Sequence, residues 1–344
     1  MYNFHIATIG GYTVKKILSI ILVCIMLLGL VSCSNHNPDT DAENRKVKIV
    51  AAMFAEYDFA RQIVGEKGQV DMLMPAGSEI HSYEPTPQDI INIKNADIFI
   101  YGGGESEEWL HTVLDSIGTD SLKIISMMDI CELYEEEIIE GMESDHDHDE
   151  NCDHEHEENE DEHHHHHDAE YDEHVWTSPL NAMKIIEKLT KAVIEIDSEN
   201  KEYYENNSSE YINEIKKLHH DFQDAVSKGK TKTLVFADRF PFRYFVEEYG
   251  LDYIAAFPGC SHDTEPSAKT IRYIIDKIKE DNISVIFTIE NSNQNVAETI
   301  SGETGAKILE FHSCHNVTKA DFDSGVTYLQ LMKKNLENLK EAIN

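Results

Sequence analysis

Short apolar runs alternate with helical segments twice along this chain of 344 residues, and this alternation limits its fold more than any other feature. In the first half, the runs VKIVAAM, QVDMLM, ADIFIY and LKIIS have the composition of strands, and Phe54–Val64 has a helical pattern. Strands of this kind, separated by helices, are typical of a parallel sheet covered on both faces. The sequence therefore predicts a first α/β lobe over residues 46–178.

The second half repeats this pattern. The runs KTLVFA, LDYIAAF, SVIFTI and AKILEF are predicted strands, and SAKTIRYIIDKIKED is a predicted helix. The last segment carries one apolar stripe at alternating steps of three and four residues, formed by Leu329, Met332, Leu336, Leu339 and Ile343. We predict a second α/β lobe, with a mostly parallel sheet flanked by helices, over residues 230–344.

A long helical segment separates the two predicted lobes. Residues 179–229 are predicted to be helical, and the pattern from about Glu199 to Ser227 contains no helix breaker. Its apolar stripe consists of Tyr211, Ile215, Leu218, Phe222 and Val226. This segment is predicted to be a rigid bridging helix. Because ligands bind outside the carboxyl ends of strands in α/β sheets, the cleft between the lobes is the expected site.

An acidic, histidine-rich stretch interrupts the first lobe. It begins at Ser144, and no Lys or Arg occurs between Glu132 and Glu173, so much of the formal net charge of -36 lies there. With few apolar residues to bury, it is predicted to be a disordered loop at about 144–171. Such a charge repels nucleic acid and attracts cations, so a nucleic-acid partner is excluded.

The histidines of this stretch indicate an accessory role in metal binding. An engineered tag is disfavoured because the histidines lie inside the chain, and a solvating loop without function is the remaining alternative. Many interchangeable donors favour instead a low-affinity metal collector, formed by His146, His148, His154, His156, His163, His164, His165, His166 and His167.

The first residues have the pattern of an export signal. Lys15 and Lys16 precede the apolar run ILSIILVCIMLLGLV, which is short for a membrane span, although a transmembrane anchor is the alternative. LVSC resembles a lipobox, in which Cys33 is lipidated after removal of residues 1–32. Residues 33–45 then form a polar tether. The sequence predicts an extracytoplasmic protein that is attached to the membrane by lipid on Cys33.

Four residues are candidate metal ligands. His81 lies in the stiff loop PAGSEIHSYEPTPQD, His174 lies in DEHVWTSP where structure resumes, and Asp238 follows a strand in FADRF. His312 follows the last strand in LEFHSCHNVT, near Glu310, Cys314 and His315. Strand alternation would place Glu310 and His312 on the same face.

Asp238 has alternative roles in pairing with Arg239 or Arg243 or in capping the next helix. Two lobes contributing nitrogen and oxygen donors suit Zn²⁺, or Mn²⁺ or Fe²⁺ with more oxygen.

GSEIHSYEPTPQD resembles the signature of the zinc/manganese solute-binding proteins of ABC importers, the ZnuA/AdcA type. The resemblance continues through GGGESEEWL, the histidine-rich insert, DEHVW, the long helix and EYGL, and it covers the chain from about Lys46. It implies two α/β lobes, a rigid bridging helix, one metal held between the lobes and a permease as partner. His81 and His174 match the family's ligand positions directly.

The match is incomplete in the second lobe. The family usually has a histidine where this chain has FADRF, so Ala237 or Asp238 stands there. The family's acidic ligand after the last strand has His312 as its nearest match, with Glu310 close by. The predicted ligands are therefore His81, His174, Asp238 and His312, with Glu290, Cys260 and Cys314 as substitutes.

Enzyme motifs are absent from the sequence. HEHEE does not have the spacing of HExxH, and neither GxSxG nor a phosphate-binding GxxxxGK[ST] occurs. We predict a monomeric binding protein that captures Zn²⁺, in preference to Mn²⁺ or Fe²⁺, for an ABC permease, and not an enzyme. The alternatives are a manganese- or iron-binding protein of the same type and a surface adhesin or metal buffer. No CxxC pair occurs, and whether Cys260 and Cys314 form a disulfide stays open.

Overall fold

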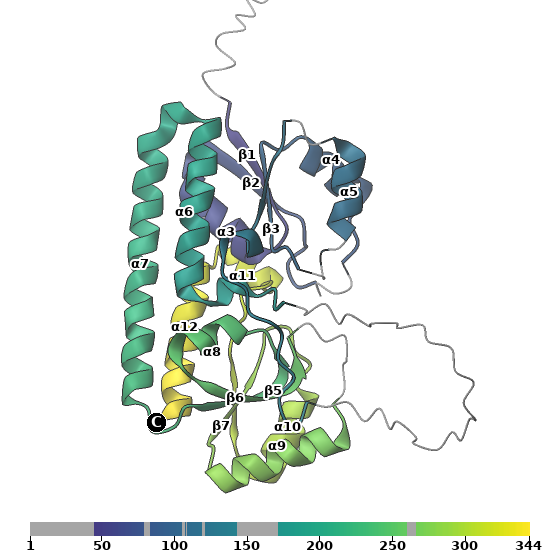
Figure 1. Ribbon diagram of the computed structural model, residues 1–344, viewed down its shortest axis with the longest axis vertical. Helices are drawn as coiled ribbons and strands as arrows, with labels where there is room; N and C mark the ends of the chain where they lie inside the picture. The colour runs from purple at the N-terminus through teal and green to yellow at the C-terminus, as the bar shows by residue number, and fades with distance from the viewer. Residues whose placement is uncertain are drawn as a thin grey trace, which may run out of the picture. The chain divides into compact units, whose positions relative to one another are not determined.

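Two parallel four-stranded sheets form the framework, as the alternation of strands and helices predicts (Figure 1). The computed structural model describes residues 45–78, 83–104, 107, 109–118, 121–142, 171–259 and 266–344. The predicted leader, Cys33, His81, the acidic histidine-rich stretch and Cys260 lie outside these residues. The chain divides into two units, Met1–Arg45 and Lys46–Asn344, and every element named below belongs to the second.

The first sheet has the order β2-β1-β3-β4. Its strands are β1 (Val47–Ala51), β2 (Gly68–Met72), β3 (Ile98–Tyr101) and β4 (Lys123–Ser126). Ile49 in the central strand pairs with Val70 on one side and Ile98 on the other. Around this sheet lie α3 (Phe54–Val64), η1 (Gly65–Lys67), α4 (Pro87–Lys94), α5 (Trp109–Ile117) and η4 (Met128–Ile130).

The second sheet repeats this topology with the order β6-β5-β7-β8. Its strands are β5 (Thr233–Phe240), β6 (Asp252–Pro258), β7 (Val285–Thr288) and β8 (Lys307–Glu310). One face of β5 places Val235 and Ala237 in a core with the helices α9 (Ala268–Asp281) and α10 (Asn295–Thr304). Leu234 and Phe236 on the opposite face pack into the main core. Burial on both faces is what a parallel sheet requires.

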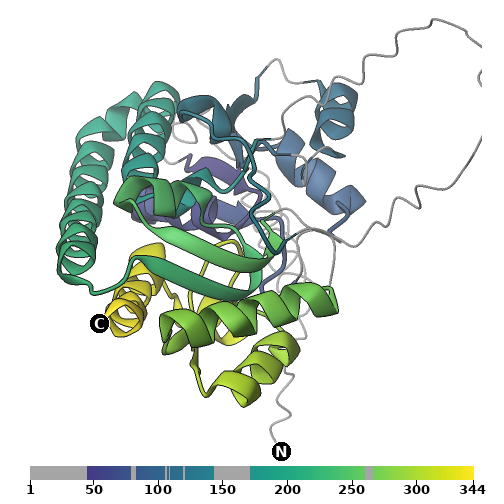
Figure 2. The same ribbon diagram turned by 60° about the horizontal axis from the view of Figure 1, so that its bottom comes forward.

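The predicted bridging helix is α7 (Lys201–Lys228), which has 28 residues. In Figures 1 and 2 it runs alongside α6 (Pro179–Ile196) and α12 (Tyr328–Ile343). Near its start, the Asn207 side chain donates a hydrogen bond to the carbonyl of Ile63 in α3 (3.0 Å). Near its end, His219 Nδ1 lies 2.6 Å from Glu248 Oε1 in α8 (Arg243–Tyr249). The helix therefore contacts both halves of the fold.

One continuous apolar core includes residues of both sheets. Ile49 and Phe99 from the first sheet and Phe236 and Phe287 from the second all belong to it. The remaining elements, η5 (Val175–Thr177), η6 (Ser198–Asn200) and α11 (Lys319–Ser324), lie in the connections. No helix among the described residues is both long enough and apolar enough to cross a membrane.

Candidate metal centre

A pocket lies where carboxyl ends of strands from both lobes meet. In each sheet the strand order reverses beside the first strand, between β1 and β3 or between β5 and β7, which is the position where ligands bind in such sheets. The pocket is lined by Met74 and Ser78 after β2, by Arg239 within β5 and by Glu290 after β7. His174 and His315 also line it.

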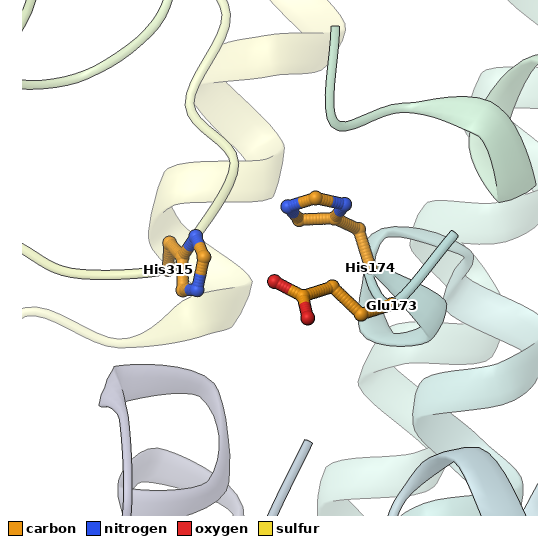
Figure 3. A group of neighbouring side chains, drawn as sticks. All are labelled: Glu173, His174 and His315. Carbon is orange, nitrogen blue, oxygen red and sulfur yellow. The ribbon is translucent and has the colours of Figure 1, made fainter. Parts of the chain in front are cut away.

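Three side chains in or beside this pocket form the group with metal-binding geometry among the described residues. Glu173, His174 and His315 each offer one ligand atom, and these atoms all lie within 4.8 Å of one another. Figure 3 shows the Glu173 carboxylate and one edge of the His174 ring pointing toward His315. Two imidazoles and a carboxylate are donors that Zn²⁺ prefers. Because His315 follows β8 and the other two precede α6, the group joins distant parts of the sequence.

Asp172 fixes the orientation of His174. Asp172 Oδ1 lies 3.1 Å from His174 Nδ1 and accepts the backbone N–H of His174 at 2.8 Å. This leaves Nε2 as the nitrogen for a metal. Burial is the largest single influence and opposes protonation of His174, but Asp172, Glu173 and Glu136 together outweigh it, so the pKa of His174 is raised above its usual value. Metal binding must displace this proton, so affinity falls as the pH falls.

Trp176 supports both histidines from behind. Its ring centroid lies 5.4 Å from that of His174 and 5.1 Å from that of His315. The indole Nε1–H donates a hydrogen bond of 2.9 Å to the Ser313 carbonyl, in the same loop as His315. Trp176 is fully buried, so this packing excludes water from one side of the group.

Asn316 attaches the loop after β2 to the loop after β8. Its side-chain amide donates to the carbonyls of Pro75 (2.9 Å) and Ser78 (2.8 Å). The loop after β2 is thereby held at the pocket as far as Ser78, and His81 lies outside the described residues.

Glu173 lies against the glycine-rich loop after β3. A Cβ on Gly104 would be only 1.8 Å from Glu173 Oε2, so the close approach requires glycine. Two more buried carboxylates, Glu56 and Glu107, interact electrostatically with Glu173. Burial is the main cause that raises the pKa of Glu107 to about 8, and it raises the pKa of Glu56 as well. The raised pKa values favour the protonated form of these two carboxyl groups next to the candidate ligand Glu173 at neutral pH.

Glu107→Gln is expected to remove part of the pH dependence of apoprotein stability. A carboxyl group whose pKa is raised by folding binds more protons in the folded state, so it contributes to stability at low pH. That contribution is lost as the pH rises from the unfolded value toward about 8. Glutamine keeps an oxygen that can accept the Gly103 N–H, bonded at 2.9 Å in the wild type. We expect the variant to melt at a higher temperature than the wild type at about pH 9 and to differ little at about pH 5.

Calorimetry at both pH values measures this effect, with the exposed Glu202→Gln as control. A wild-type advantage at the higher pH would contradict the raised pKa of Glu107.

The structure brings one of the described predicted ligands, His174, into the group. Asp238 lines the adjoining hollow with Asn291 and Ser292, and its carboxylate accepts the Arg239 N–H at 2.9 Å. His312 is buried, and its Nδ1 accepts the Cys314 N–H at 2.9 Å. Since β8 ends at Glu310, strand alternation does not extend to His312.

The substitute ligands and neighbours have other contacts. Glu310 pairs with Lys334 at 2.7 Å. Cys314 is a buried free cysteine, and burial raises the pKa of its thiol well above the usual value, which disfavours the thiolate that a metal needs. Cys260, His81 and the nine histidines of the acidic stretch lie outside the described residues.

The predicted ligand set did not include Glu173 and His315. Glu173 precedes His174 directly, and His315 lies three residues after His312. Both residues lie within the predicted candidate segments DEHVWTSP and LEFHSCHNVT, so their closeness in sequence to His174 and His312 is the signal that could have found them.

Comparisons with known proteins identify close relatives. The sequence model of the family described as "Zinc-uptake complex component A periplasmic" matches residues 49–342. The high-affinity zinc uptake system protein ZnuA of Bacillus subtilis is 34% identical over 326 residues, which cover 95% of this chain and 97% of that protein. The zinc-binding lipoprotein AdcA of Streptococcus pneumoniae is 32% identical over 331 residues, which cover 95% of this chain but only 61% of AdcA.

A solved structure agrees with these matches. The crystal structure of the Zn(II)-bound ZnuA-like domain of Streptococcus pneumoniae AdcA superimposes with a TM-score of 0.68 at 28% identity. The alignment covers 87% of this chain and 99% of that domain.

Proposed function

This chain belongs to the family of the periplasmic zinc-uptake complex component A, and on that basis we propose that it captures Zn²⁺ outside the cytoplasm and delivers it to an ABC permease. The resemblance seen in the sequence motifs is confirmed by the family match. Zinc uptake systems of this kind are transport systems and not enzymes, which agrees with the absence of enzyme motifs.

The observation that carries the proposal is the group of Glu173, His174 and His315. Its ligand atoms lie within 4.8 Å of one another at the meeting of the two lobes. Two nitrogen donors and one oxygen donor suit a tetrahedral zinc site that needs one more ligand. We assign the fourth position to His81, because Ser78, three residues earlier, lines the same pocket. Both lobes would then contribute to one bound ion.

The rest of the proposed function concerns location and supply. Lipid on Cys33 would hold the protein at the outer face of the membrane, and the acidic histidine-rich stretch would raise the local supply of zinc. The core shared by the two lobes and the helix α7 limit movement between the lobes. Release to the permease would therefore proceed by local rearrangement of the loops that carry the ligands.

A zinc titration tests the assignment of the main site. We expect a variant that lacks residues 144–170, and so keeps the pairing between Tyr171 and Glu135, to retain one tightly bound zinc per chain. Competition with a chromophoric chelator gives the affinity, and mass spectrometry of the intact protein counts the metal. Disappearance of the tight equivalent in this variant would place the main site in the deleted stretch.

Uptake of radioactive zinc by cells separates transport from storage or adhesion. Deleting the gene is expected to reduce the initial rate of uptake from low zinc concentrations, and the intact gene is expected to restore it. Unchanged uptake with normal zinc binding by the purified protein would favour a metal buffer or adhesin.

A further inference from the structure

His315 is presented by an unusual turn in the loop after β8. Cys314, the residue before it, has a φ of 61°, in the left-handed region that residues with a side chain seldom adopt. Such a conformation is strained for a residue with a side chain and persists only where surrounding contacts enforce it. The turn that aims His315 at the metal therefore needs support from elsewhere in the fold.

Glu290, which lies in the loop after β7, supplies much of the support for this turn. It follows β7, and its carboxylate accepts the backbone N–H groups of Ser313 (2.8 Å) and His315 (3.2 Å). It also accepts the Ser313 hydroxyl at 2.5 Å. Since Glu290 is only 7% exposed, these bonds are made in a place where water competes poorly.

His312 and Asn335 complete the support. His312 Nδ1 accepts the N–H of Cys314 at 2.9 Å. The Asn335 amide in α12 accepts the N–H of His312 at 2.7 Å and donates to its carbonyl at 2.8 Å. The backbone N–H groups of Ser313, Cys314 and His315 are thus all bonded to side chains, two of them to Glu290.

We infer that Glu290 is a positioning residue for the metal: it holds His315 in its binding position and is not itself a ligand. This inference rests on the proposed function and adds a role for a residue outside the ligand group. A ligand that is already held in place need not be ordered when the ion binds, so the ordering cost does not reduce the affinity. The role differs from the one that the sequence suggested for Glu290, which was that of a substitute ligand.

A double-mutant cycle with Glu290→Gln and His315→Ala tests the inference. Glutamine has nearly the same shape but replaces one accepting oxygen with an N–H₂ group, which cannot accept from Ser313 or His315. We expect Glu290→Gln alone to weaken zinc binding about 10–100-fold, the usual effect of removing an orienting partner. In the His315→Ala background, Glu290→Gln is expected to weaken zinc binding little further, because Glu290 acts on the metal through the position of His315, which is no longer there.

Three measurements accompany the cycle. X-ray absorption of the zinc-loaded Glu290→Gln protein is expected to show an unchanged number of ligands. Glu310→Gln is the matched control, because Glu310 ends β8 but pairs with Lys334 away from the pocket, and its affinity is expected to match the wild type. Ser313→Ala removes one donor to Glu290 and is expected to weaken binding in the same direction by a smaller factor, which provides a second test if Glu290→Gln folds poorly.

Results that contradict the positioning role differ from results that contradict the proposed function. A missing oxygen ligand in the Glu290→Gln spectrum, or an equal loss of affinity in both backgrounds, would overturn the positioning role. Unchanged affinity in both Glu290→Gln and Ser313→Ala would also overturn it. A wild-type protein without a tight zinc site would instead refute the proposed function.

Discussion

Replacing His174 with alanine is expected to weaken zinc binding by more than about 100-fold, because even the loss of an orienting partner costs about 10–100-fold. His174 is the ligand candidate that both the sequence and the geometry select. Its Nδ1 is held by Asp172, so its free nitrogen is placed before the ion arrives. Competitive titration with a chelator measures the change, and circular dichroism shows whether the fold is retained.

The control for this variant is His220→Ala. His220 lies on the exposed side of α7, where it contacts Gln223 and the ring of His219, and it takes no part in the candidate group, so its removal is expected to leave zinc affinity unchanged. Wild-type affinity in His174→Ala would exclude the group of Glu173, His174 and His315 as the main site.

Replacing Trp176 with alanine is expected to reduce the free energy of unfolding by about 3–5 kcal/mol, the usual cost of removing a large buried aromatic side chain. Trp176 is completely buried and donates its indole N–H to the Ser313 carbonyl. Its removal leaves a cavity and an unpaired carbonyl behind His174 and His315. Urea unfolding of the zinc-free protein, followed by circular dichroism, measures the loss.

Two variants test the specificity of this effect. Trp109→Ala removes the other tryptophan, which is partly buried in α5, and is expected to cost less. Trp176→Phe fills most of the space but lacks the N–H, so its loss should lie between that of alanine and zero. Equal destabilisation by Trp109→Ala and Trp176→Ala would show that Trp176 contributes no more to stability than a partly buried tryptophan far from His174 and His315.

The framework of the fold could be predicted from the sequence because its signals are local. The eight apolar runs correspond to the eight strands among the described residues, and the segment from Glu199 to Ser227 corresponds to α7 at Lys201–Lys228. Composition and periodicity are enough for such elements, since central strands such as β3 and β7 are short runs of buried apolar residues and α7 carries one apolar stripe.

The candidate ligand group was harder to predict from the sequence because one of its members, His315, is placed by a turn. Extending the strand alternation beyond Glu310 favoured His312, but β8 ends there and the left-handed Cys314 redirects the chain. That turn is held by Glu290 and Asn335, which lie 23 residues before Ser313 and 23 residues after His312. No periodic pattern encodes contacts over such separations. The sequence does point to His174 as a candidate, because a structured segment begins directly after the acidic stretch, and the structure places it in the candidate group.

The apolar core that runs through both sheets also affects the folding and the proteolysis of the chain. Phe99 and Phe287 belong to the same core although 187 sequence positions separate them, and α12 at the extreme end packs against it as well. A chain in which only the first half has folded exposes apolar surface that the second half covers, so folding of the first lobe is expected to depend on the second. Because the two lobes share this core, cleavage of the chain within either lobe is expected to expose core residues of both and to destabilise the whole fold.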